Sequence, residues 1–154
     1  MGIEDLARKY SDDKAAAAVM RVLRRVDPQY MWVGGVADLA KYYEKYDPWG
    51  IQVIRTLHKF WSDGIVEIKK SVNLEERLAI RRILVDEGKI VEDALPIIAG
   101  PQDVPAEYRK MWQEFANSSP PGYRLTDLGR RLPIYQRISE KEYAPIPALV
   151  PIPA

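Results

Sequence analysis

Four polar side chains between residues 52 and 59 share one helical face, because they recur at i, i+3, i+4 and i+7. They are Gln52, Arg55, Thr56 and Lys59. In the major groove of DNA, arginine can bind guanine, glutamine can bind adenine, and threonine can contact the thymine methyl group. Lys59, together with Lys69 and Lys70 further along the chain, can contact phosphates. The same residue types also occur on ordinary solvated helix faces, so the pattern alone leaves both interpretations open.

Other kinds of chemistry have little support in the sequence. There is no cysteine and only one histidine, His58, which argues against thiol catalysis, multi-histidine metal sites and a Ser–His–Asp triad. Glycine-rich phosphate-binding loops are absent. The adjacent acidic pairs do not share a helix face, so none forms an acid–base dyad. We therefore expect no catalytic residue, no metal site, no cofactor and no enzymatic activity.

Composition favours a globular protein. The 154 residues are 47% hydrophobic and 29% charged, with a net charge of +1. No run reaches the roughly 18 apolar residues of a membrane span, and the acidic start MGIEDLARKY does not resemble a secretory signal. The lack of cysteine and the many prolines are typical of thermophiles. We expect a cytoplasmic protein of a thermophile that does not bind membranes.

Hydrophobic periodicity predicts the helices that position these side chains. A helix is expected over residues 15–26, capped by Ser11 or Asp12, and a second over 36–46 after a break at Gly34-Gly35. A third runs from Pro48 to Ser62, and its buried stripe is expected to comprise Ile51, Ile54, Leu57 and Trp61, widened by Val53 and Phe60. Further helices are expected over 73–87, 92–99, 105–117 and 126–132, the last of which can continue through 134–143. Short strands are expected at 30–33, 65–70, 89–91 and 123–125.

These elements recur in the same order in the two halves of the chain. The proline-started helices begin at Pro48 and Pro105, 57 residues apart, and the strands that follow a glycine begin at Ile65 and Tyr123, 58 residues apart. Such similar offsets predict an architectural duplication. We expect an N-terminal unit over 1–71, a C-terminal unit over 72–143, and a proline-rich apolar tail over 144–154.

The N-terminal unit resembles the winged helix-turn-helix superfamily. The resemblance lies in Val36-Ala37-Asp38-Leu39-Ala40, in the segment PWGIQVIRTL at 48–57, and in the step Asp63-Gly64-Ile65-Val66. The C-terminal unit resembles it through GYRLTDLGRRL at 122–132. No single family is indicated. The resemblance implies a mainly α fold with small β wings, that is, a tandem winged helix-turn-helix protein that uses the helix from Pro48 as its recognition helix.

Charge separates the two units. Residues 12–71 contain 10 basic and 8 acidic side chains, whereas residues 72–142 contain 11 basic and 12 acidic ones. The N-terminal unit is therefore the better nucleic-acid candidate. We expect a protein that binds double-stranded DNA, as a transcriptional regulator or a chromatin-associated factor.

The tail supports an alternative function. It has four non-proline aliphatic side chains spaced along an extended chain, where they can pack on a partner, on a second copy or on the chain itself. These residues are Ile146, Leu149, Val150 and Ile152. The alternative is a non-enzymatic protein-binding or structural subunit of a multisubunit assembly, which includes a nucleoprotein assembly, that uses its winged-helix units and this arm.

Overall fold

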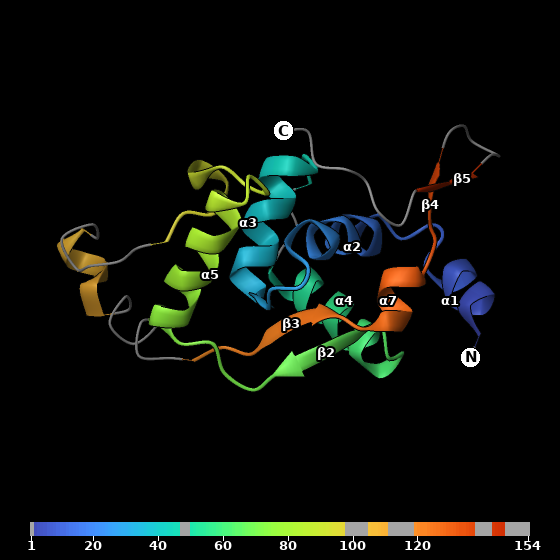
Figure 1. Cartoon of the computed structure of the whole chain (residues 1–154), viewed down its shortest axis with the longest axis horizontal. Coiled ribbons are helices and arrows are strands. Elements are labelled where there is room, and N and C mark those ends of the chain that lie inside the picture. Colours follow the sequence, from blue (N-terminus) through green and yellow to red (C-terminus); the bar gives the residue numbers. More distant parts are fainter. Residues whose placement is uncertain (1, 47–49, 98–104, 111–118, 138–142, 147–154) are drawn as a thin grey trace.

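The computed structural model describes residues 2–46, 50–97, 105–110, 119–137 and 143–146. The described part is mainly helical with a small antiparallel sheet, as the sequence predicts (Figure 1). Its α-helices, in chain order, are α1 (Ile3–Lys9), α2 (Lys14–Val26), α3 (Val33–Tyr43), α4 (Gly50–Ser62), α5 (Leu74–Asp86) and α7 (Asp127–Arg131). The 3-10 turns are η1 (Glu92–Ala94) and η3 (Ala106–Tyr108), and the strands are β1 (Met31–Trp32), β2 (Val66–Lys69), β3 (Gly122–Leu125), β4 (Ile134–Arg137) and β5 (Tyr143–Ile146).

Local signals place several helix ends correctly. The Asn73 side chain accepts a hydrogen bond from the Glu76 backbone N–H and caps α5, and Thr126 accepts one from Gly129 and caps α7. Gly64 and Gly88 have positive φ angles just beyond α4 and α5, a conformation that favours glycine. For α2 the predicted cap was wrong, because Asp13 rather than Ser11 or Asp12 accepts the Ala16 N–H.

Two other local predictions were wrong. Gly34 and Gly35 do not break the chain but lie in the first turn of α3. A Cβ at position 35 would lie 2.4 Å from the Met31 sulfur, so glycine permits α3 to pack closely against the preceding strand. Residues 89–91 form no strand, and the helix expected from residue 92 is only a 3-10 turn before the described segment ends at residue 97.

Strands from both predicted units form a single sheet. Its order is β1-β3-β2, and both pairings are antiparallel. Val66 pairs with Leu125, Lys69 pairs with Gly122, and Met31 pairs with Tyr123. The predicted boundary between residues 71 and 72 thus separates strands that are hydrogen-bonded to each other, and the tandem arrangement is not confirmed.

The hydrophobic core lies between the sheet and the helices. Helix α2 contacts α3, α4 and β3, and α4 contacts β2. The residues that α2 buries include Val19, Met20, Leu23 and Val26. In Figure 1, α1 and α5 lie on opposite sides of this central packing.

The end of the described chain forms a hairpin. Residues 134–137 are strand β4 and not a continuation of the preceding helix, because Ile134 pairs with Ile146 and Arg137 pairs with Tyr143 of β5. Residues 144–146 of the predicted tail therefore lie in a paired strand. Leu149, Val150 and Ile152 lie outside the described residues.

Candidate nucleic-acid interface

Helix α4 is oriented by a buried stripe that differs from the predicted one. Val53, Leu57 and Phe60 are buried as expected. Ile51, Ile54 and Trp61 are instead 56%, 46% and 52% exposed. The apolar side of the helix is broad, so sequence periodicity cannot select which part of it packs against the core.

One contact that fixes this orientation comes from α1. The Tyr10 ring packs edge-on against Phe60, with 5.2 Å between the ring centroids. Sequence periodicity missed α1 altogether, so this contact could not enter the prediction.

The four residues of α4 that were predicted to bind DNA differ in exposure. Gln52, Arg55 and Lys59 are exposed, as expected of side chains that contact a ligand. Thr56 is only 5% exposed, so the prediction that it lies on the outer face was wrong. Thr56 lies on the buried side of the helix, three residues after Val53 and four residues before Phe60.

The two lysines near the end of β2 that were predicted to contact phosphates differ in their ion pairing. Lys69 forms an ion pair with Glu76 in the first turn of α5, which compensates its charge. Lys70 is exposed just beyond the end of β2, and it has no ion-pair partner among the described residues. Lys70 is therefore the stronger phosphate candidate of the two.

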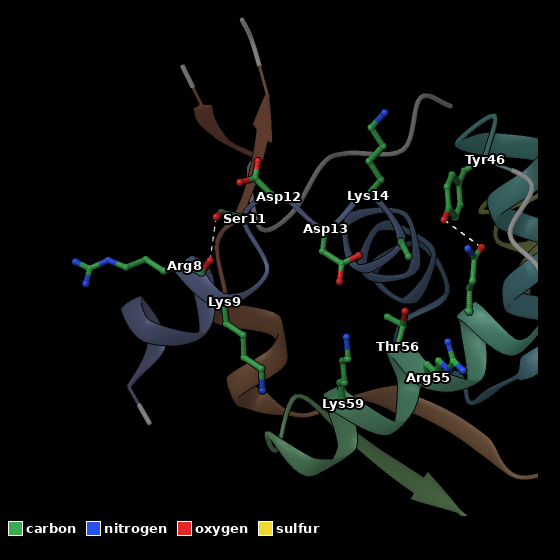
Figure 2. A pocket seen from close by; sticks show the side chains of 12 residues that line it. Arg8, Lys9, Ser11, Asp12, Asp13, Lys14, Tyr46, Arg55, Thr56 and Lys59 are labelled. Atoms are coloured by element: carbon green, nitrogen blue, oxygen red, sulfur yellow. Dashed lines mark hydrogen bonds between the residues drawn. The ribbon is translucent and has the colours of Figure 1, made fainter. Parts of the chain in front are cut away.

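The polar side of α4 forms one wall of an open cavity, which we call the α4 cavity (Figure 2). The opposite wall is the end of α1 and the start of α2, and the volume is about 680 Å³. It is lined by Arg8, Lys9, Ser11, Asp12, Asp13, Lys14, Ala15, Tyr46, Gln52, Arg55, Thr56 and Lys59. All four residues of α4 that were predicted to contact DNA therefore line this cavity, together with residues that lie some 40 positions earlier in the chain.

Positive charge predominates around this cavity. Its lining contains five cationic side chains, from Arg8, Lys9, Lys14, Arg55 and Lys59, and two carboxylates, from Asp12 and Asp13. Lys9 forms an ion pair with Asp63. Within the described part of the chain, Arg8, Lys14, Arg55 and Lys59 have no ion-pair partner. Such a surface attracts anions.

A cluster at the end of α4 holds the two walls together. The Asp63 carboxylate accepts hydrogen bonds from Lys9 Nζ at 2.7 Å and from Tyr10 Oη at 2.6 Å. Burial opposes ionisation of Asp63, but the hydrogen bonds from Lys9 and Tyr10 outweigh it and lower the pKa of this carboxyl below its usual 3.8. Burial and the hydrogen bond to Asp63 raise the pKa of the Tyr10 phenol above its ordinary value.

The Asp63 cluster gives a pH-dependent contribution to stability. Because the folded-state pKa of Asp63 is lowered, its contribution is present above the unfolded-state value near 3.8 and disappears as the pH falls through the lower folded-state value. We expect the Asp63→Asn variant to melt at a lower temperature than the wild type at neutral pH, and the difference to shrink in acid. Thermal unfolding of both proteins over a pH series measures this. A difference that is constant or grows towards low pH would contradict the assignment.

Sequence reasoning missed the cavity's α1–α2 wall. Arg8, Lys9 and Lys14 are ordinary charged residues near two helix ends, and nothing local links them to residues 52–59. A signal for α1 was nevertheless present, because Leu6, Ala7 and Tyr10 lie at i, i+1 and i+4 and are all buried.

Other classes of site can be addressed only for the described residues. In these ranges no group of three or more His, Cys, Asp or Glu side chains is placed to hold a metal ion. The helices of the described ranges are all too short or too polar to cross a lipid bilayer.

Comparisons with other proteins do not assign the chain to a family. No protein-family model matches the sequence, and no significant match is found among curated proteins or solved structures.

Proposed function

We propose that the chain is a DNA-binding protein, a transcriptional regulator or chromatin-associated factor, that contacts duplex DNA with the polar side of α4. The observation that supports this most strongly is the charge on that side. Arg55 and Lys59 are exposed and have no ion-pair partner within the described residues, and further cations from the α1–α2 wall surround them. Phosphate contacts of this kind provide most of the affinity of proteins for DNA.

The arrangement of elements supports a single winged helix-turn-helix unit in this proposal. Helices α3 and α4 are followed by β2, which pairs with β3, so that the two strands correspond to the wing. Residues 70–121, which include α5, then stand as an insertion between the wing strands. Within the described part of the chain, this arrangement supports α4 as the recognition helix.

Arg55 is the side chain on which base recognition most depends in this proposal. The substitution Arg55→Ala is expected to weaken binding to a preferred duplex by about 1–3 kcal/mol, since arginine binds guanine through two hydrogen bonds. Fluorescence anisotropy with labelled duplex DNA measures the affinity, and a selection from random duplexes supplies the preferred site. The control is Arg82→Ala, which removes an exposed arginine from α5. Equal losses for both variants, or none, would mean that α4 does not recognise the DNA.

A second candidate function follows from the apolar residues on the same helix. Ile51, Ile54 and Trp61 are about half exposed, and Ile68 of β2 is 37% exposed. Large apolar side chains gathered on one helix are typical of protein contacts. This favours the alternative of a protein-binding or structural subunit of a larger assembly.

Light scattering on the purified chain tests the second candidate in its simplest form, self-association. We expect a mass above the 17.7 kDa of one chain if α4 packs on a second copy. The substitution Trp61→Glu should then restore the monomer mass, because a charge would replace an apolar contact. A monomeric wild type at high concentration would eliminate self-association through this helix.

A further inference from the structure

We propose that the α4 cavity is a binding site for a small phosphorylated molecule that also has hydroxyl groups, such as a sugar phosphate or a nucleotide. This binding does not depend on the proposed contact with DNA. Four features of the cavity support it: a hydroxyl group on its floor, cations on its walls, a carboxylate that can accept a further hydrogen bond, and its size.

The hydroxyl on the cavity floor belongs to Thr56. Its residue is 95% buried, and Figure 2 shows the hydroxyl directed from α4 into the cavity. No hydrogen-bond partner for this hydroxyl occurs among the described residues. The hydroxyl opens onto the cavity, where a ligand can form a hydrogen bond with it. As a donor, the hydroxyl suits a phosphate oxygen.

Cations flank this hydroxyl. Arg55 precedes Thr56 and Lys59 follows it by one helical turn, so both lie along the same wall. In Figure 2 the Lys59 side chain extends from α4 towards the α1–α2 wall, whereas Arg8 and Lys14 extend outwards at the rim. Hydrogen bonds from such cations to phosphate are about twice as strong as neutral ones. The wall of α4 therefore provides the phosphate subsite.

Asp13 on the opposite wall specifies a second part of the ligand. Its Oδ1 accepts the Ala16 N–H at 3.0 Å, so the N-terminus of α2 is already capped and does not bind the anion. The carboxylate points into the cavity (Figure 2), where its remaining lone pairs can accept a hydrogen bond from a ligand hydroxyl. A carboxylate also repels a second phosphate, which favours a ligand that places its phosphate against α4.

The size of the cavity agrees with a ligand of this class. Its volume of about 680 Å³ lies within the range of roughly 300–1,000 Å³ that is usual for small-molecule sites. A phosphate group of the DNA backbone shares the chemistry of the proposed ligand, and the experiment must distinguish the two sources.

Isothermal titration of ribose 5-phosphate into the full chain at low salt tests the proposal. We expect saturable binding of ribose 5-phosphate and none of unphosphorylated ribose. Thr56→Val keeps the shape of the side chain but removes the hydroxyl, and it should weaken binding about tenfold, because a hydrogen bond to a charged group is lost. Thr56→Ser keeps the hydroxyl and should bind within about threefold of the wild type.

Charge is tested with a second pair of variants. Lys59→Gln should weaken binding of ribose 5-phosphate about tenfold, while Lys41→Gln, which removes an exposed lysine of α3 outside the cavity, should leave it within about twofold. Because Lys59 is exposed, this pair remains informative even if Thr56→Val does not fold. No binding of ribose 5-phosphate, or equal binding by the wild type and Lys59→Gln, would overturn the proposal.

DNA titrations separate this inference from the proposed function. We expect Thr56→Val to bind duplex DNA as the wild type does, because its hydroxyl lies on the cavity floor. If Thr56→Val weakens DNA binding and ribose 5-phosphate does not bind, the cavity holds a backbone phosphate and the small-molecule proposal fails. If ribose 5-phosphate binds and DNA does not, the proposed function fails and the cavity assignment stands.

Discussion

The substitution Gly129→Ala is expected to lower the free energy of unfolding by about 3 kcal/mol, because it places a methyl group against backbone that cannot move away. A Cβ at position 129 would lie 2.1 Å from the Ile65 carbonyl oxygen. That oxygen accepts hydrogen bonds from the Thr126 N–H at 3.0 Å and from the Thr126 hydroxyl at 3.1 Å. Relieving the overlap therefore breaks contacts between α7 and the turn that leads into β2. The expected loss exceeds the gain of about 1 kcal/mol from replacing glycine by alanine in a helix.

Gly34→Ala is the matched control. Gly34 also lies in a helix, but a Cβ there would meet no atom closer than 3.7 Å. This variant should be more stable than the wild type by about 0.5–1 kcal/mol. Urea denaturation of the three proteins measures both effects. If Gly129→Ala gains stability as Gly34→Ala does, α7 does not pack against Ile65, and the link between the two halves of the chain is incorrect.

The substitution Phe60→Ala is expected to lower the free energy of unfolding by about 3–5 kcal/mol, since it removes a large buried side chain and leaves a cavity. Phe60 is fully buried and packs against Tyr10, so the change also loosens α1. The neighbouring Trp61 is 52% exposed, and Trp61→Ala should cost less than about 1 kcal/mol.

This pair of substitutions decides which face of α4 is buried. The sequence-based stripe placed Trp61 in the core with Phe60 at its margin, whereas the structure places only Phe60 there. Chemical denaturation distinguishes the two orientations directly. A larger loss for Trp61→Ala than for Phe60→Ala would restore the sequence-based orientation and would expose Thr56.

Elements with strong local signals were predictable from the sequence. Helix α2 has a clear apolar stripe and differs from its predicted range by one residue, and α5 and α7 begin after the predicted caps Asn73 and Thr126. Strand β3 also lies where it was expected. These features depend on interactions within one or two turns of chain, which sequence patterns record.

Contacts between distant segments were not predictable. Residues 70–121 separate β2 from β3 in the sequence, and no local pattern specifies that these two strands pair. Two similar series of elements therefore predicted a duplication, whereas strands from both predicted units lie in one sheet. Gly35 shows the same limit on a smaller scale, because its place in α3 depends on close packing against Met31 and Trp32.

The candidate site was predictable in part for the same reason. The spacing of Gln52, Arg55 and Lys59 placed them on one side of a helix, and their side chains are exposed. Thr56 has the same helical spacing as these residues, but it lies where α4 packs against the core. Its burial depends on that packing, which sequence spacing does not specify. The contribution of Arg8, Lys9 and Lys14 required the docking of α1 through Tyr10 and Asp63.

The most direct test of the DNA-binding proposal is the salt dependence of duplex DNA affinity for the double variant Arg55→Ala/Lys59→Ala. The control is Lys41→Ala/Arg82→Ala, which removes the same charges from exposed positions on α3 and α5. Each lost phosphate contact lowers the slope of log affinity against log salt by about one. The proposal predicts weaker binding for the α4 variant. Its slope should be smaller by about one, because Lys59 contacts a phosphate whereas Arg55 contacts a base, and the control should stay close to the wild type. Identical affinities and slopes for both double variants would contradict the proposal that α4 binds DNA.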